Sequence, residues 1–392
     1  RYRIATFVNS TTVTLSGSPS AGSGLTWNIG GAVLTIGAIL ANANNAFQSA
    51  DTCYIGAGTY REVVTIAITS LVAETKIVGD VNGSKTGDAG AVIWTAYLTN
   101  DKTAASASSL ITMNGRDYLT FEDIVLIGGG ADIVNATTAS STNFTFRRCV
   151  WLPPSGTNDQ SINYTVPVDT NTGVILDSCI FGFPGSNQAL RLTLPTSASA
   201  DYDVNIQIKN CVFYTGSANA MLILGTGANS FKGGGVDVFN CTFYGGGKAM
   251  TTNDANISTS IPNTIYNCYI QTGNAGAALS ANASGQIVED YNIIMAATAR
   301  SNVTAGTSSI SNGSYSNMIE IGQWMLNGGM PRPFVMPMVG SPLLGFGSMP
   351  SAVQVIDMWN RQRPAGGLST LYGIGALERH DTAARETSTL YG

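Results

Sequence analysis

A short pattern that recurs five times around a cysteine constrains this chain more than any other feature. Each copy reads apolar, any, polar, Cys, any, apolar, as in residues 208–213. The copies follow one another at intervals of 30, 32, 30 and 27 residues. Their cysteines are Cys149, Cys179, Cys211, Cys241 and Cys268. A period of roughly 20 to 50 residues is typical of solenoids, in which each repeat stacks on the next.

A second series, an alanine followed by leucine or methionine, runs in step with the first. Its large residues are Leu190, Met221, Met250 and Leu279. Each repeat therefore holds about three short apolar runs, which Gly, Asn, Ser and Pro separate and which are too short for helices. Three strands per repeat, stacked at the strand spacing of ~4.8 Å, describe a parallel β-helix. The sequence thus predicts an all-β solenoid over residues 51–300.

The polar residue before each cysteine lies where the chain must turn a corner between two strands. Asparagine tolerates the left-handed backbone of such a corner, and stacked asparagine amides can hydrogen-bond along the ladder. The asparagines at this position are Asn210, Asn240 and Asn267. Two positions after the cysteines we expect an inward-facing aromatic stack of Trp151, Phe181, Phe213 and Phe243. The five thiols are predicted to be free, buried and stacked, which suits synthesis in a reducing cytoplasm.

The two ends of the chain differ from the repeats. Apolar residues at helical spacing from Val33 to Phe47 predict a helix that caps the first turn. After Asn302 the repeat fades into a segment rich in Met and Pro, which we interpret as an irregular cap or alternatively as a subunit contact. The expected divisions are an N-terminal hairpin and linker (1–27), a capping helix (28–50), the β-helix (51–300), a C-terminal cap (301–378) and an arm (379–392).

The arm repeats part of the cap. The sequence Ser-Thr-Leu-Tyr-Gly at 369–373 recurs at 388–392, the end of the chain. We expect the second copy to dock as an added strand on a neighbouring subunit or a decorated surface, with Leu390 and Tyr391 entering pockets. The alternative is that it folds back on its own cap.

Composition narrows the classes of partner. Only 11% of the 392 residues are charged, and the net charge is -5. No Lys/Arg run is present, so we expect no nucleic-acid partner. The longest apolar run, near residues 32–41, is too short to cross a bilayer, so we expect no membrane partner. The chain begins with Arg1 and shows no signal-like segment, from which we expect that upstream residues were cleaved or are not shown.

No catalytic residue, metal ligand or cofactor is assigned. The cysteines lack the close pairs of zinc sites, since no two of them are closer than 27 residues. The one histidine, His380, lies in the tail, away from the repeats. Carboxylates fall in three groups: Asp117, Glu122 and Asp123; Asp159, Asp169 and Asp177; Asp201, Asp203 and Asp237. A lyase with an acidic cluster, Ca²⁺ and Arg147, Arg148 or Lys209 as its base stays open, but solvated surface positions are the plainer interpretation.

Several segments resemble right-handed parallel β-helix proteins of the pectate-lyase-like kind. The run Ile-x-x-Gly-Thr-Tyr-x-Glu at 55–62, after a capping helix, looks like their opening turn. Residues 76–80 and 87–90 are similar to turns of phage and prophage members, and 340–342, 361–364 and 373–378 resemble their closing segment. The resemblance covers roughly residues 28–378. It implies a right-handed coil, and it leaves function open because this fold carries lyases, hydrolases, adhesins, tailspikes and inert spikes.

Together these observations favour a non-enzymatic structural protein of a virus particle, a phage capsid decoration protein or spike. The expected partners are further copies of the chain in a homotrimer and other virion proteins such as the major capsid protein. Its expected place is the surface of the particle, after synthesis in the host cytoplasm. The alternatives are a tailspike or lyase that binds or cleaves cell-surface polysaccharide, and a bacterial surface adhesin.

Overall fold

The computed structural model of the chain describes most of the repeat region. Described are residues 35–41, 47–68, 71–99, 105–138, 140–152, 160–182, 188–215, 219–273 and 276–311. Four further strands are described by their backbone alone, over residues 4–9, 12–15, 319–325 and 331–337. Residues 1–34 form a unit separate from the rest of the chain. Leu390 and Tyr391, and hence the predicted arm, lie outside the described residues.

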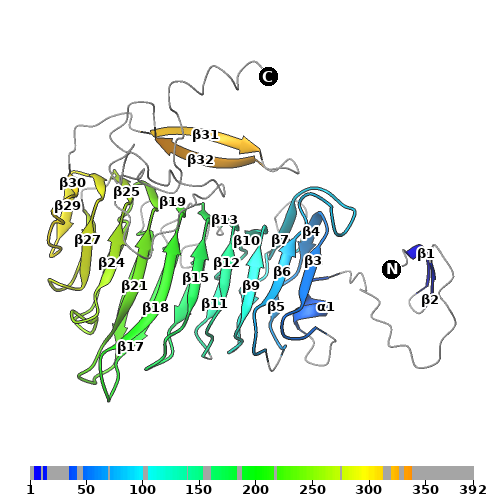
Figure 1. The fold of residues 1–392 in the computed structure, drawn as a ribbon, viewed down its shortest axis with the longest axis horizontal. Coiled ribbons are helices and arrows are strands. Elements are labelled where there is room, and N and C mark those ends of the chain that lie inside the picture. The colour runs from blue at the N-terminus through cyan, green and yellow to red at the C-terminus, as the bar shows by residue number, and fades with distance from the viewer. Residues whose placement is uncertain are drawn as a thin grey trace, which may run out of the picture. The chain divides into compact units, whose positions relative to one another are not determined.

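The described repeats form three parallel sheets that share one solenoid, so the predicted parallel β-helix with three strands per turn is confirmed (Figure 1). Sheet 1 comprises β3 (Thr52–Ile55), β6 (Thr75–Gly79), β9 (Leu119–Glu122), β12 (Thr145–Arg147), β15 (Val174–Asp177), β18 (Tyr202–Lys209), β21 (Gly233–Phe239), β24 (Asn263–Tyr266) and β27 (Ile287–Asp290). Sheet 2 comprises β4 (Gly58–Arg61), β7 (Val92–Thr95), β10 (Val125–Ile127), β13 (Val150–Leu152), β16 (Ile180–Phe181), β19 (Val212–Thr215), β22 (Thr242–Gly245), β25 (Tyr269–Thr272), β28 (Ile293–Met295) and β30 (Ile310–Ser311).

Sheet 3 completes each turn. It comprises β5 (Val64–Thr65), β8 (Ile111–Thr112), β11 (Val134–Ala136), β14 (Ile162–Thr165), β17 (Leu190–Pro195), β20 (Met221–Thr226), β23 (Met250–Thr252), β26 (Ala277–Ser280) and β29 (Thr298–Ser301). The second sequence series aligns in its register, with Leu190 beside Met221, and Met250 beside Met221 and Leu279. Parallel strands that follow one another in this way are joined by right-handed crossovers.

The corner between sheets 1 and 2 repeats the same backbone conformation in seven turns. The residue before each cysteine position has a φ between 52° and 57° in Asp123, Arg148, Ser178, Asn210, Asn240, Asn267 and Tyr291. This left-handed conformation is cheapest for Gly and Asn, which explains the asparagines. The side-chain amide of Asn240, however, has no hydrogen-bond partner in the described part of the chain. At that position the asparagine serves the backbone turn rather than a ladder of amides.

The core fills the space between the sheets with stacked side chains. The rings of Phe181 and Phe213 stack with centroids 4.6 Å apart, and those of Phe213 and Phe243 with centroids 4.8 Å apart. Trp151 continues the stack at 5.3 Å from Phe181. All four side chains are at most 1% exposed. Like residues meet because the register places each repeat directly on the preceding one.

Each end of the solenoid is closed by a carboxylate. At the first turn, Glu62 accepts hydrogen bonds from the backbone N–H groups of Ile36 (2.6 Å) and Gly37 (2.9 Å), at the start of helix α1 (Gly37–Leu40). The structure describes only this one turn of the predicted helix. At the last turn, the buried Glu289 replaces a core residue and binds Arg300 at 2.6 Å. Glu62 thus holds the start of the helix whose Ile36 and Leu40 pack on the core, and Glu289 is paired within the last turn.

Two hairpins lie outside the repeats. Strands β1 (Ile4–Asn9) and β2 (Thr12–Leu15) pair antiparallel, as the sequence predicts for the N-terminus. Strands β31 (Ile319–Met325) and β32 (Pro331–Pro337) form a second antiparallel pair within the segment predicted as a C-terminal cap.

Candidate functional site

The cysteine ladder lies at the corner between sheets 1 and 2, directly after the left-handed residue. All five of its cysteines are free and fully buried. The backbone N–H of Cys179 donates to Sγ of Cys211 at 3.4 Å, and Cys211 and Cys241 repeat this contact with the next cysteine along. The corner breaks the regular sheet pairing, so each sulfur supplies the acceptor that the preceding turn lacks.

The end of the ladder shows the same role in a different residue. After Cys268 the position is occupied by Asn292, whose Oδ1 accepts the N–H of Cys268 at 2.8 Å. The thiols donate in turn to nearby carbonyl groups, as Cys241 does to Phe239 at 3.2 Å. Burial raises the pKa of the Cys149, Cys211 and Cys268 thiols, so these groups stay protonated. The ladder is therefore a structural element rather than a set of nucleophiles or metal ligands.

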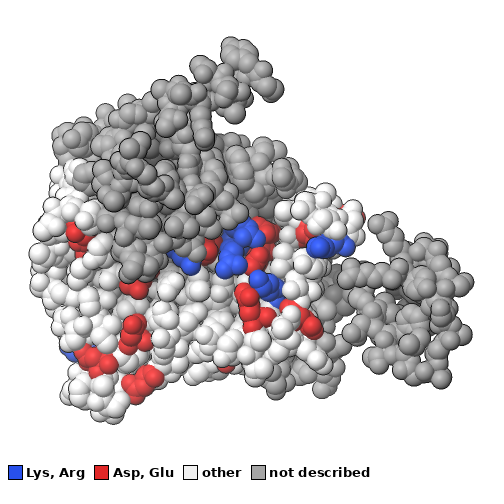
Figure 2. Space-filling view, viewed as in Figure 1, with Lys and Arg blue, Asp and Glu red and all other residues white. Residues whose placement is uncertain are grey.

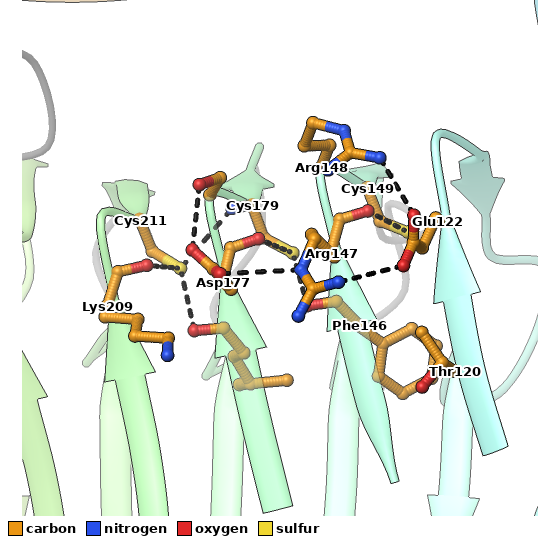
Figure 3. Close-up of polar contacts among 12 residues, drawn as sticks. Thr120, Glu122, Phe146, Arg147, Arg148, Cys149, Asp177, Cys179, Lys209 and Cys211 are labelled. Atoms are coloured by element: carbon orange, nitrogen blue, oxygen red, sulfur yellow. Dashed lines mark hydrogen bonds and ion pairs between the residues drawn. The ribbon is translucent and has the colours of Figure 1, made fainter. Parts of the chain in front are cut away.

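Charged side chains gather on the outer face of sheet 1 (Figure 2). The last positions of successive strands carry Glu122, Arg147, Asp177 and Lys209, which stand side by side in register. Arg147 bonds Glu122 at 2.9 Å and lies 3.5 Å from Asp177, so one guanidinium joins carboxylates of the two flanking turns (Figure 3). This alternation of charge along the solenoid is a cross-strand ladder of the kind that stabilises a sheet.

A second guanidinium completes this cluster from the corner position. Arg148 binds Asp123 at 2.7 Å and Glu122 at 2.9 Å. Burial by itself lowers the pKa of Arg148, but the two carboxylates outweigh it and raise the pKa above its ordinary value. Glu122, Asp123, Arg147, Arg148 and Asp177 are henceforth called the ion-pair cluster. The acidic and basic side chains of the cluster already bind one another, so most of their charge is neutralised by ion pairs between neighbouring turns.

The structure separates most of the carboxylates that the sequence grouped. Asp117 accepts hydrogen bonds from Thr142, and Asp169 accepts one from Ser199. Asp201 accepts from the backbone N–H of Lys232 and from the hydroxyl of Ser258. Asp159 lies outside the described residues. Asp117, Asp169 and Asp201 therefore each brace a loop or a turn.

Asp203 and Asp237 remain close enough to affect each other. They come from the adjacent strands β18 and β21. Burial raises the pKa of Asp237, the charge of Asp203 raises it further, and a 2.5 Å hydrogen bond from Thr264 opposes both. Lys209 lies on β18 two positions after Gln207, the register partner of Asp237, and burial lowers the pKa of Lys209. Among the described residues, these two carboxyl groups in unlike environments resemble an acid–base arrangement.

Among the described residues, no three or more His, Cys, Asp or Glu side chains are grouped so as to hold a metal ion. Their helices include none that has the length and apolar character needed to cross a bilayer.

Sequence reasoning overlooked one row of residues. The position directly after each cysteine, treated as unconstrained, faces outward from sheet 2 and is buried nonetheless. It holds Val150, Ile180, Val212, Thr242 and Tyr269. The signal was present, because none of these residues is charged and most are apolar. It was missed because alternation along a strand assigns that position to solvent.

Comparison with known proteins adds little beyond the architecture. No protein-family model matches the chain, and no curated protein matches it. Among solved structures, the pectin methylesterase from Aspergillus niger in deglycosylated form shares 15% identity over 75% of this chain and 84% of its own, with a TM-score of 0.26. A penultimately deglycosylated form of that protein shares 16% identity over 75% of this chain and 85% of its own, with a TM-score of 0.25. The sheet topology itself carries the assignment of the fold.

Proposed function

We propose that this protein is a non-enzymatic structural component of a virus particle, a decoration protein or spike on its surface. The observation that carries the proposal is the ion-pair cluster. Its five charged groups bind one another between turns at 2.7 to 3.5 Å, so these ion pairs hold neighbouring turns of the solenoid together. The stacked aromatics and the sulfur-bridged corners act in the same direction. A body whose middle turns are reinforced in these ways suits a mechanical role.

Assembly on the particle is part of the proposal. We infer a homotrimer that contacts other virion proteins such as the major capsid protein, because a chain with only 11% charged residues leaves broad neutral surfaces for contacts between subunits. Closed rotational symmetry is the default for such assemblies. The terminal Ser-Thr-Leu-Tyr, with Leu390 and Tyr391, is the proposed tether between neighbours. A linked arm raises the effective concentration of a weak contact without a large interface.

Location tests this proposal directly. Antibodies raised against the recombinant chain should label the surface of intact virus particles from the source culture in immunogold electron microscopy. Sedimentation should give about three times the mass of the 40.8 kDa chain. Removing residues 380–392 should leave a folded body that no longer labels particles when added back. Labelling of cell envelopes alone would show an adhesin instead.

A second candidate function, binding or cleavage of polysaccharide, is favoured by Asp203 and Asp237. A carboxyl group with a raised pKa beside a second carboxylate is the arrangement that hydrolysis of a sugar linkage requires. Incubation with a panel of acidic and neutral polysaccharides, followed by chromatography of the products, tests it. Product release by the wild type, abolished by Asp237→Asn and unchanged by Asp117→Asn, would establish this function. Absence of products with every polysaccharide would remove it.

A further inference from the structure

Two asparagine–glycine pairs lie in connections between the first strands of the solenoid. Asn82-Gly83 lies in the loop that follows β6, and Asn114-Gly115 forms the turn after β8. Two further pairs, both beyond residue 311, lie outside the described residues. The two described glycines share a left-handed backbone, with a φ of 68° at Gly83 and 69° at Gly115. The two pairs therefore match in sequence and in the conformation of the glycine, and their hydrogen bonds can be compared directly.

An asparagine that precedes a glycine can undergo a reaction that needs no other reagent than water. The backbone nitrogen of the glycine attacks the side-chain carbonyl carbon of the asparagine and forms a cyclic succinimide. The bond from that carbon to the amide nitrogen breaks, and the nitrogen leaves as ammonia with the hydrogen of the glycine N–H. Water then opens the ring at either carbonyl group and gives aspartate or isoaspartate. Glycine favours the attack because it has no Cβ to hinder the approach, and the attack is intramolecular.

Hydrogen bonds hold both reacting groups of the first pair. The N–H of Gly83 donates to the backbone oxygen of Asp80 at 2.9 Å. The side-chain Oδ1 of Asn82 accepts the N–H of Ser84, also at 2.9 Å. The backbone of Asn82 forms an antiparallel bridge with Ala89, which closes the loop. The nitrogen of Gly83 can reach the amide carbon only after these hydrogen bonds break, and their loss has a cost.

The reacting groups of the second pair are held far less. No residue in the described part of the chain accepts a hydrogen bond from the N–H of Gly115. Asn114 is exposed, and its side chain makes one long contact, from Nδ2 to the backbone oxygen of Ile66 at 3.4 Å. A hydrogen bond of this length is weak, and it involves the nitrogen that leaves. The attack at Asn114 therefore requires no strong hydrogen bond to break.

We propose that Asn114 is a site of spontaneous deamidation, and that the folded loop protects Asn82 from the same reaction. The reaction needs only the chain and water, so it does not depend on the function proposed above. Its product places a carboxylate, which cannot donate to Ile66, beside the side chain of Arg116, whose Nε also lies 3.4 Å from the backbone oxygen of Ile66. Isoaspartate in addition lengthens the backbone at a residue whose φ is 52°. The second turn of the solenoid thus gains negative charge as the protein ages.

Ageing of the full-length chain tests this proposal. The protein is kept at mildly alkaline pH and physiological temperature, and samples are taken over several weeks. Peptide mass spectrometry measures the exchange of the amide for a carboxyl group at each asparagine, and electron-transfer fragmentation separates isoaspartate from aspartate. A parallel sample in urea gives the two rates in the unfolded chain. Asn114→Gln is the test variant, because a longer side chain must close a larger ring, and Asn82→Gln is its matched control.

In the folded chain we expect Asn114 to convert at least tenfold faster than Asn82. A factor of ten corresponds to about 1.4 kcal/mol, which is close to the net strength of one hydrogen bond. In urea the two rates should converge, since the hydrogen bonds that distinguish the pairs are then lost. Asn114→Gln should remove the product at this position, and Asn82→Gln should leave it unchanged.

Three results would overturn the proposal. Equal rates in the folded chain, or faster conversion at Asn82, would show that the hydrogen bonds of Gly83 and Asn82 give no protection. Absence of conversion at Asn114 would show that its turn does not permit the attack. A tenfold difference that persists in urea would assign the difference to the flanking sequence instead of the fold.

Discussion

The outer faces of sheets 1 and 2 differ in the side chains that hold neighbouring turns together. Both belong to the same turns and have the same parallel register. Sheet 1 presents polar residues and binds its turns together with ion pairs such as Arg147 to Glu122. Sheet 2 presents an apolar row that includes Val150, Ile180 and Val212, which pack against one another across the turns. The difference is one of side-chain chemistry: ion pairs join neighbouring turns on sheet 1, and apolar contacts join them on sheet 2.

The largest effect should come from a charge placed in the apolar row of sheet 2. Ile180→Asp puts a carboxylate at a site that is 1% exposed, so we expect the free energy of unfolding to fall by about 3 kcal/mol or more. Ile175→Asp, in the same turn but at a half-buried position on sheet 1, should cost about 1 kcal/mol. Denaturation by guanidinium measures both, and equal losses would erase the distinction between the two faces.

Substitutions at the corner between sheets 1 and 2 should cause the next largest loss of stability. Cys241→Ala removes the acceptor for the N–H of Cys211 and opens a small void, so we expect a loss of about 2 kcal/mol. Cys241→Ser keeps an oxygen acceptor and should lose less. If alanine is tolerated as well as serine, the sulfur is not acting as an acceptor.

Thiol labelling is the companion measurement for that corner. In the native protein a maleimide should reach Cys53, which is half-buried, before any cysteine of the ladder. Rapid native labelling of Cys211 or Cys241 would contradict their complete burial.

A smaller effect is expected from the charged face. Glu122→Gln weakens contacts to Arg147 and Arg148, whose side chains are 31% and 34% exposed, so solvent screening limits the loss to about 1–2 kcal/mol. The loss should shrink in high salt. Glu74→Gln, at a carboxylate that is 51% exposed beside Lys76, is the control and should change stability by under about 0.5 kcal/mol. A salt-independent loss at Glu122 would point to packing instead of charge.

The smallest effect should be a pH dependence on sheet 1. Burial raises the pKa of Asp237 above the ordinary aspartate value of 3.8, so the folded state holds this proton more tightly than the unfolded state. The contribution to stability is therefore present below pH 3.8 and is lost as the pH rises through the raised pKa. Asp237→Asn should gain on the wild type between pH 4 and pH 7 in denaturation experiments. A constant difference between the two proteins over that range would contradict the raised pKa.

Sequence alone determined the architecture because the repeat is strict. The same pattern recurs around cysteines 27 to 32 residues apart, so like residues stack, and stacking leaves a parallel β-helix as the solution for three short strands per turn. The left-handed corner at Asn210, Asn240 and Asn267 also followed from residue type, since few residues tolerate that conformation. Burial of the five thiols followed from the apolar positions on either side of them.

Only the tertiary structure decided which charges meet and which outward side chains are buried. Glu122 and Arg147 are 25 residues apart in the chain, and only the register between β9 and β12 makes them neighbours. Asp117 belonged to the same sequence group as Glu122 yet faces a different loop. The residue after each cysteine was left unconstrained, because alternation describes one strand at a time. Burial of an outward side chain depends on what the rest of the chain lays across it, and that is a property of the folded molecule.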